Sequence, residues 1–231
     1  MDTSKLSYRY IDSRARDYDE KRVGRKKWLV EERIIKGFLD QFPQGTHILD
    51  IPVGTGRFIP FYKNYNFKVT GMDISRDMLE ESQKKVVAKN FNIVLKQGSI
   101  FEIEFPDGHF DVVLCIRFLN WIDYDNLAIA IKEIARVAHD SLIIGVRHLA
   151  PVKDLAVYTP VGMMRFIRQQ YLLRLRRSFQ KQELVYHKKR EIEFLFKKYN
   201  LRVSEAACVE KRADGTDYFI YLVRKDQKGE S

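Results

Sequence analysis

A glycine turn between two apolar segments constrains the fold of this chain more than any other feature. Residues 47–58 (HILDIPVGTGRF) contain an apolar run that ends in Asp50, a Gly54-x-Gly56 turn and a segment that can begin a helix. Glycine adopts left-handed backbone conformations that other residues avoid, and the first turn of a helix has free N–H groups. The run therefore predicts a strand, a tight turn and a helix start that can bind a nucleotide. An ordinary glycine turn is the alternative.

The residues around this turn distinguish between kinds of nucleotide. A dinucleotide site has a third glycine three residues after the second, where this chain has Ile59, which argues against a nicotinamide-dependent oxidoreductase. A second apolar run at residues 68–74 (KVTGMDI) contains Asp73 near its end. It lies about 20 residues beyond the turn, where a carboxylate can bind a ribose diol. We therefore expect Asp50 and Asp73 to lie beside one ligand.

These two segments resemble the cofactor-binding core of the class I methyltransferases, which use S-adenosylmethionine (SAM). The resemblance covers roughly residues 46–149, since QGSI at 97–100 and FPDGHFDVVLC at 105–115 look like the family's third strand, adenine loop and fourth strand. Two positions depart from the family's pattern. Pro52 stands where a motif glycine is usual and has no N–H to donate, and Ser99 is a neutral acceptor where an Asp is usual.

The resemblance implies SAM as the cofactor and gives roles to individual residues. Asp73 would bind the ribose, and Asp50 the amino group, directly or through water. Gly54 and Gly56 would contact the methionyl part. Tyr18-Asp19-x-x-Arg22 resembles a stretch that folds over the cofactor in the family, and a solvated charged face is the alternative. The expected cofactor-binding residues are Tyr18, Arg22, Asp50, Pro52, Gly54, Thr55, Gly56, Arg57, Asp73, Ile74, Met78, Ser99, Ile100 and Arg117.

Composition and periodicity predict one α/β domain. The chain has 231 residues, 45% of them hydrophobic. It contains no apolar run near the ~18 residues that a membrane span needs. It begins without a signal pattern, and its two cysteines have no metal or redox spacing, so we expect a cytoplasmic protein without a metal site. Strand and helix patterns alternate, which predicts a Rossmann-like, doubly wound, mostly parallel sheet of seven strands.

The expected domain has four parts. Residues 1–45 would form a helical lid and a helix from Lys26, and residues 46–149 the SAM-binding core. Residues 150–182 would form a basic helical insertion after the fifth strand, and residues 183–231 the last helix and a terminal antiparallel hairpin that turns at 214–215. The other expected elements are helices at 77–89, 124–138 and 183–199, and strands at 92–96, 111–116, 141–146, 201–210 and 216–224.

Residues that follow the fourth and fifth strands are candidates for the acceptor site, because ligands bind at the carboxyl ends of parallel strands. Methyl transfer from a sulfonium is an in-line displacement, so a general base is optional. His148 and Arg147 are the catalytic candidates, and a hydrogen-bonded structural histidine is the alternative. Asn120 and Trp121 are expected on the substrate side. The sequence RFLNW at 117–121 differs from the Asn-Pro-Pro-Tyr type of amino-methylating DNA enzymes, which argues against base methylation.

A basic segment follows the fifth strand. Residues 161–202 contain 12 Lys or Arg and 3 Glu, in a chain with a net charge of +10. Clustered arginines pair with phosphate or carboxylate, which predicts an anionic acceptor, with Arg165, Arg168 and Tyr171 on the substrate side. A solvated helix face, RNA and an anionic membrane surface are the alternatives.

The sequence therefore predicts a methyltransferase that transfers a methyl group from SAM to a small or glycan-linked, anionic acceptor without a metal. Two alternatives stay open. One is a methyltransferase that acts on RNA or at a membrane surface, and the other is a protein that binds SAM without transferring a methyl group.

Overall fold

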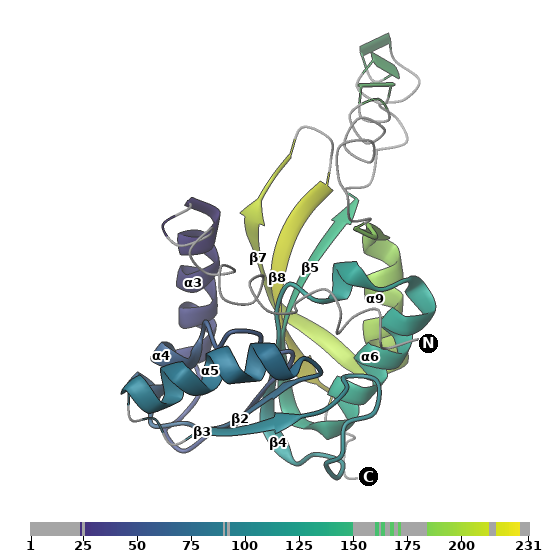
Figure 1. Cartoon of the computed structure of the whole chain (residues 1–231). Helices are drawn as coiled ribbons and strands as arrows, with labels where there is room; N and C mark the ends of the chain where they lie inside the picture. Colours follow the sequence, from purple (N-terminus) through teal and green to yellow (C-terminus); the bar gives the residue numbers. More distant parts are fainter. Residues whose placement is uncertain are drawn as a thin grey trace.

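One mixed sheet runs through the computed structural model, with helices on both faces (Figure 1). The structure describes residues 24, 26–89, 91, 93–149, 160, 161, 163, 164, 167, 168, 171, 184–212 and 216–226. The strands are β1 (His47–Asp50), β2 (Lys68–Asp73), β3 (Ile93–Gln97), β4 (Phe110–Cys115), β5 (Ala138–Leu149), β6 (His187–Lys188), β7 (Leu201–Glu210) and β8 (Thr216–Lys225). The helices are α3 (Lys26–Leu39), α4 (Ile59–Tyr62), α5 (Arg76–Lys89), α6 (Tyr124–Val137) and α9 (Lys189–Lys198), with short 3₁₀ turns η2 (Lys63–Tyr65) and η3 (Leu119–Trp121).

The order of the strands places the ligand-binding edge. The sheet runs β3-β2-β1-β4-β5-β8-β7, and β6 pairs with β5 outside this path. The strands from β3 to β5 are parallel, whereas β8 is antiparallel to both β5 and β7. The chain leaves β1 toward β2 and later returns to its other side as β4. This reversal of direction opens a crevice at the carboxyl ends of β1 and β4. The architecture confirms the Rossmann-like sheet with a terminal hairpin.

Two apolar layers hold the helices against the sheet. On one face, Ile35 and Leu39 of α3 and Tyr62 of α4 pack with alternate side chains of the central strands. On the other face, α6 and α9 pack against the intervening side chains, with Ile131 and Phe196 buried among them. Successive side chains of a strand point to opposite faces, so both faces of the long strand β5 are covered. The helix expected from Lys26 is present as α3, and Ile35 and Leu39 lie on its buried face.

The last helix begins later than its sequence pattern predicts. It was expected from about residue 183, but α9 starts only after the two-residue strand β6. Two backbone groups explain the difference. Val185 N donates to Asn120 O at 2.9 Å, and Lys188 N donates to the side chain of Glu191 at 2.8 Å. These bonds hold the chain extended before the helix and cap its first turn.

Several expectations lie outside the described residues. These are the N-terminal lid, most of the basic insertion and the turn at 214–215. Within the described ranges, no helix combines the length and the apolar character needed to span a membrane.

Candidate active site

The glycine turn after β1 has the geometry that its sequence predicts. Gly54 and Gly56 have φ angles of 57° and 71°, in the left-handed region that favours glycine. A Cβ at Gly56 would come within 2.5 Å of the Ile59 side chain, so Gly56 is required for packing. A Cβ at Gly54 would meet no atom within 4 Å, and Gly54 lines a cleft. The turn thus keeps open a space that a side chain would fill.

This cleft lies at the carboxyl ends of β1, β2 and β4. Its aromatic walls are Trp28 from α3, Phe58 from the glycine turn, and Phe118 and Trp121 from the segment after β4. The expected cofactor residues that line it are Pro52, Gly54, Thr55, Arg57, Asp73, Ile74, Met78 and Arg117. A smaller recess adjoins it and shares Pro52, Asp73, Ile74 and Phe118 with the cleft.

The recess contains the two residues expected at an adenine. Ser99 and Ile100 line it together with Phe101. Ser99 Oγ accepts a hydrogen bond from the N–H of Phe101 at 3.2 Å, which fixes the loop. Cleft and recess adjoin, and together they contain members of the expected binding set from Pro52 to Arg117.

Asp73 lies where the cleft and the recess meet. Its Oδ2 accepts the N–H of Gly54 at 2.9 Å, and its Oδ1 accepts the N–H of Ser75 at 2.9 Å. Burial raises the pKa of Asp73 to about 6, and these backbone hydrogen bonds oppose the rise. The carboxylate is therefore oriented by the glycine turn and by the start of α5.

Asp50 has different surroundings from Asp73. It is buried, lines neither the cleft nor the recess, and accepts a hydrogen bond from the Tyr62 hydroxyl at 2.7 Å. Burial raises the pKa of Asp50 to about 7, although the Tyr62 hydrogen bond opposes this. The structure thus directs Asp50 toward α4, and a contact with a ligand's amino group stays a prediction.

A buried carboxylate on α3, which sequence reasoning missed, holds two arginines at the mouth of the cleft. Glu31 has no exposed surface and pairs with Arg57 Nη1 at 2.6 Å and Arg117 Nη2 at 2.5 Å. Arg57 also lies over the Trp28 ring, 3.7 Å from its centroid. Burial alone would raise the pKa of Glu31, but Arg117 and Arg57 outweigh it and lower that pKa. The sequence did carry a signal, because Glu31 lies at helical spacing between the apolar residues Trp28 and Ile35.

The residues expected on the acceptor side are only partly brought together. Trp121 lines the cleft, and its Nε1 donates to Arg117 O at 3.0 Å. Asn120 is buried, and its amide bonds to the backbone of Arg147 and Val185, at 2.6–2.8 Å. Asn120 therefore joins the ends of β4 and β5 to the segment before β6.

Arg147 and His148 lie on opposite faces of β5. His148 is 2% exposed, its Nε2 is 2.7 Å from the Tyr221 hydroxyl, and its ring stacks on Phe219. Burial lowers the pKa of His148. Arg147 instead faces α3 and pairs with Glu210 at 2.5 Å. Neither residue lines the cleft.

The remaining expected site residues do not meet the cleft within the described part of the chain. Tyr18, Arg22 and Arg165 lie outside the described residues. Arg168 and Tyr171 are exposed and belong to a segment that projects from the body (the green segment in Figure 1).

Comparison with known proteins identifies the domain around this cleft. Residues 48–141 match the family model described as a methyltransferase domain. Residues 48–141 form a methyltransferase domain. The matched range includes the glycine turn, Asp73 and the recess at Ser99.

Relatives and solved structures agree with this assignment. A phosphatidylethanolamine N-methyltransferase of Cereibacter sphaeroides is 29% identical over 126 residues, which cover 53% of this chain and 61% of the relative. The putative methyltransferase YqeM of Bacillus subtilis is 37% identical over 97 residues, 41% of this chain and 39% of the relative. The chain therefore spans less than two thirds of either relative.

The fold comparison extends over nearly the whole chain. One solved structure is the magnesium protoporphyrin IX methyltransferase ChlM of Synechocystis PCC 6803 with bound SAH, S-adenosylhomocysteine. It aligns with a TM-score of 0.71 at 17% identity, and the alignment covers 97% of this chain and 100% of that one. At this identity the likeness shows the shared fold. The shared fold thus includes α3, α9 and the terminal hairpin, which lie outside residues 48–141.

Proposed function

We propose that this chain is a SAM-dependent methyltransferase that acts on a small or glycan-linked, anionic acceptor. The observation that carries the proposal is the cleft at the ends of β1, β2 and β4, where Asp73 is oriented by two backbone N–H groups beside an open glycine turn. SAM fits this site, because a carboxylate, a glycine turn without steric obstruction and an adjoining apolar recess suit a ribose, an amino-acid tail and an adenine.

Each part of the site has a separate task in this proposal. Asp73 would accept hydrogen bonds from the ribose hydroxyls, and Ser99 with Ile100 would border the adenine. Arg57 and Arg117, both held by Glu31, would face the carboxylate of the amino-acid tail. Guanidinium groups pair well with carboxylates, and their fixed positions limit the entropy lost on binding.

SAM supplies an activated methyl group, so the chain's own contribution is alignment and exclusion of water. Trp28, Phe118 and Trp121 provide aromatic walls of the cleft. In-line displacement gains much of its acceleration from holding the reacting atoms in line. The burial of His148 and its contacts with Tyr221 and Phe219 favour the structural histidine over a general base.

Calorimetry with SAM, SAH and NAD tests the proposal. We expect SAM and SAH to bind and NAD to bind weakly or not at all. Asp73→Asn should weaken SAH binding by about 1–3 kcal/mol, because the charged acceptor for the ribose is lost. The wild-type affinity should also fall as pH decreases through about 6, where Asp73 takes up a proton, and Asp73→Asn should reduce this dependence. Tight NAD binding without SAH binding would contradict the proposal.

A second candidate is methyl transfer at an anionic membrane surface. Exposed apolar side chains support it, with Met164 72%, Ile167 58% and Tyr171 60% exposed in the projecting segment. The basic segment at 161–202 adds the charge that attracts such a surface. The relative from Cereibacter sphaeroides is named for a phospholipid acceptor, which fits this alternative.

A further inference from the structure

Three cationic side chains converge on one carboxylate oxygen where α3 meets the ends of β5, β7 and β8. The oxygen is Oε2 of Glu210, at the end of β7. It lies 2.5 Å from Arg147 Nη2, 2.9 Å from Arg212 Nε and 3.5 Å from Lys27 Nζ. Three positive charges thus share one negative charge. We call these four residues the Glu210 cluster.

Two neighbouring carboxylates do not offset this excess of positive charge. Asp217 Oδ1 accepts a hydrogen bond from the backbone N–H of Arg212 at 3.1 Å. Glu31, on the same helix as Lys27, is already shared between Arg57 and Arg117. Burial, followed by the charge of Arg147, lowers the pKa of Lys27 to about 8, and the charges of Glu210 and Glu31 only partly oppose this. The corner therefore has an excess of positive charge.

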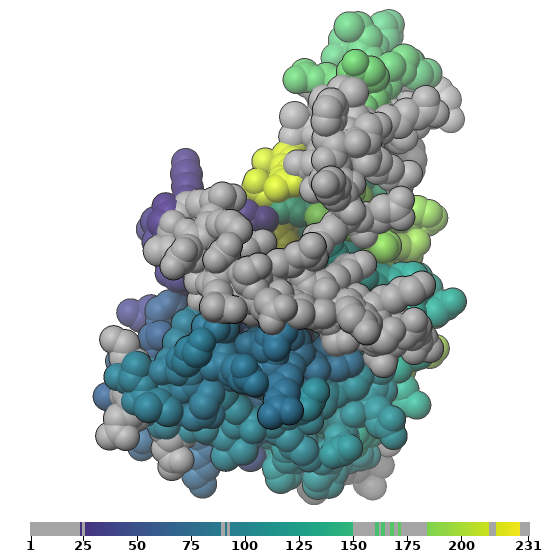
Figure 2. Space-filling model, in the orientation of Figure 1, coloured from purple at the N-terminus to yellow at the C-terminus, as the bar shows by residue number. Residues whose placement is uncertain are grey.

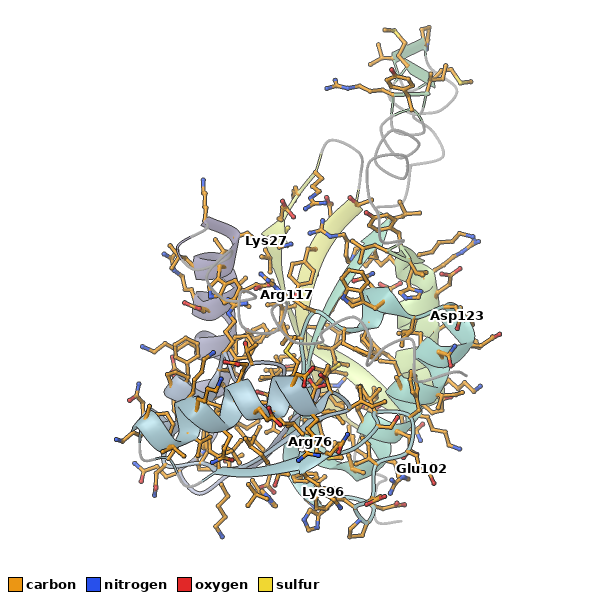
Figure 3. All side chains as sticks on the ribbon, viewed as in Figure 1. Lys27, Arg76, Lys96, Glu102, Arg117 and Asp123 are labelled. Carbon is orange, nitrogen blue, oxygen red and sulfur yellow. The ribbon has the colours of Figure 1, made fainter. Side chains whose placement is uncertain are left out.

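The Glu210 cluster is next to the cofactor cleft. Trp28, which follows Lys27 in α3, lines the cleft, and so does Arg117. Figure 3 shows Lys27 and Arg117 on the same side of the sheet, between α3 and the strands β7 and β8. The ring of Tyr218, on β8, lies beneath both cations, 4.8 Å from Lys27 Nζ and 5.4 Å from Arg147 Cζ.

Solvent reaches this corner. The side chains of Lys27 and Arg212 are 33% and 23% exposed. Figure 2 shows part of the terminal hairpin, in yellow, at the surface between α3, in purple, and the green segment. Arg147 is buried, and its Nη1 donates to the backbone carbonyl of Thr216. An ammonium group has three donors and a guanidinium group five, so the cluster still has more donors than Glu210 Oε2 and this carbonyl accept.

We propose that Lys27, Arg147 and Arg212 form a subsite for an oxyanion, a carboxylate or phosphate group, of the methyl acceptor. The inference rests on the proposed methyl transfer and locates the anionic group of the acceptor at this corner. The two guanidiniums supply directional hydrogen bonds and Lys27 a compact charge. An oxyanion that joins or displaces Glu210 brings the cluster closer to neutrality.

The test uses two simple anions as probes, inorganic phosphate and malonate, titrated calorimetrically at low ionic strength without SAM. We expect the wild type to bind at least one probe, and the preferred probe to indicate whether the subsite suits a phosphate or a carboxylate. Lys27→Met should weaken that binding by about tenfold or more. The matched control is Lys26→Met, which removes the same charge from the adjacent, exposed position.

The pH dependence provides a second readout. Lys27 faces Arg147 on β5, Glu210 on β7 and Tyr218 on β8. Arg117, after β4, and Glu31, on its own helix, also act on its charge. Probe binding should weaken as pH rises through about 8, where Lys27 loses its proton. Lys27→Arg should bind the probe throughout this range, since a guanidinium keeps its charge.

SAH titrated into each variant separates the two proposals. If SAH binds but neither anion binds the wild type, the subsite is refuted and the methyltransferase proposal stands. If anions bind through Lys27 but SAH does not, the subsite stands and the proposed function fails. Equal losses in Lys26→Met and Lys27→Met would assign the effect to net charge and refute the subsite.

Discussion

Two aspartates that occupy equivalent places in the sequence have different roles in the structure. Asp50 and Asp73 both end short apolar strands, and the sequence predicts both at the ligand. Asp73 lies at the cleft, whereas Asp50 bonds to Tyr62. The difference depends on the path of α4, which brings the Tyr62 hydroxyl to β1. Strand-end spacing contains no information about that path.

The Asp50–Tyr62 pair gives a pH-dependent prediction. The pKa of Asp50 is about 7 in the folded chain and 3.8 ordinarily, so this group's contribution to stability falls as pH rises between these values. Tyr62→Phe removes the hydrogen bond that favours the ionised form and raises that pKa further. We expect the loss in unfolding free energy to be about 1–3 kcal/mol at pH 8 and smaller at pH 6, measured by urea denaturation.

The chain offers a control for this substitution. Tyr65 donates a hydrogen bond to Asp40 at 2.5 Å at an exposed site. Tyr65→Phe removes the same chemical group without leaving a buried carboxylate. Its effect should be below about 1 kcal/mol and nearly independent of pH. A comparable pH dependence in both variants would contradict our account of Asp50.

At the scale of elements, α3 both packs on the sheet and connects two parts of the cleft. Its apolar face could be predicted from helical spacing, as could the positions of most strands, because those signals are local. Its buried Glu31 ties it to the glycine turn through Arg57 and to the end of β4 through Arg117. The helix thereby links the glycine turn, on one side of the cleft, to the segment after β4.

Glu31→Gln should therefore affect both stability and cofactor binding. The substitution leaves two partly buried guanidiniums without their shared carboxylate, and we expect a loss of about 3 kcal/mol in unfolding free energy. SAH affinity should fall as well, because Arg57 and Arg117 line the cleft. Glu32→Gln is the matched control. Glu32 lies 3.3 Å from Arg57 Nε and is 26% exposed, so its loss should cost less than about 1 kcal/mol. If both substitutions lower the unfolding free energy and the SAH affinity equally, Glu31 contributes no more than the exposed Glu32.

Elements set by distant contacts could not be predicted in the same way. The start of α9 depends on a bond between Val185 and Asn120, which are far apart in the sequence. The Glu210 cluster likewise forms only because β8 lies between β5 and β7 and brings Lys27, Arg147 and Glu210 to one corner. The sequence showed the basic character of the chain, and it predicted the anion site in the basic segment at 161–202.

At the scale of the molecule, the net charge of +10 predicts attraction to anionic surfaces, which vesicle binding can test. If the acceptor is held at a membrane, the chain should sediment with vesicles that contain phosphatidylglycerol and not with vesicles of phosphatidylcholine alone. Binding should decrease with salt, since exposed charges are screened over about 8–10 Å near physiological ionic strength.

Substitution of exposed apolar side chains by serine makes this test specific to the projecting segment. Met164→Ser with Ile167→Ser should reduce vesicle binding, because both side chains are exposed there. The control is Val87→Ser with Phe194→Ser, at positions 71% and 59% exposed on other helices. Equal binding by both variants and the wild type would leave charge alone as the cause and rule out insertion of this segment.

The contacts of α3 also impose an order of assembly. Its neighbours are β7 and β8, and the hydrogen bond from Gln41 to Glu205 joins residues 164 positions apart. Contacts between β1, β2 and β3 close much shorter loops, which form faster than long ones. On the ribosome, the strands that bear the cofactor cleft are synthesised before the hairpin that completes the Glu210 cluster. We therefore expect the nascent chain to contain the proposed SAM site before it contains the proposed acceptor subsite.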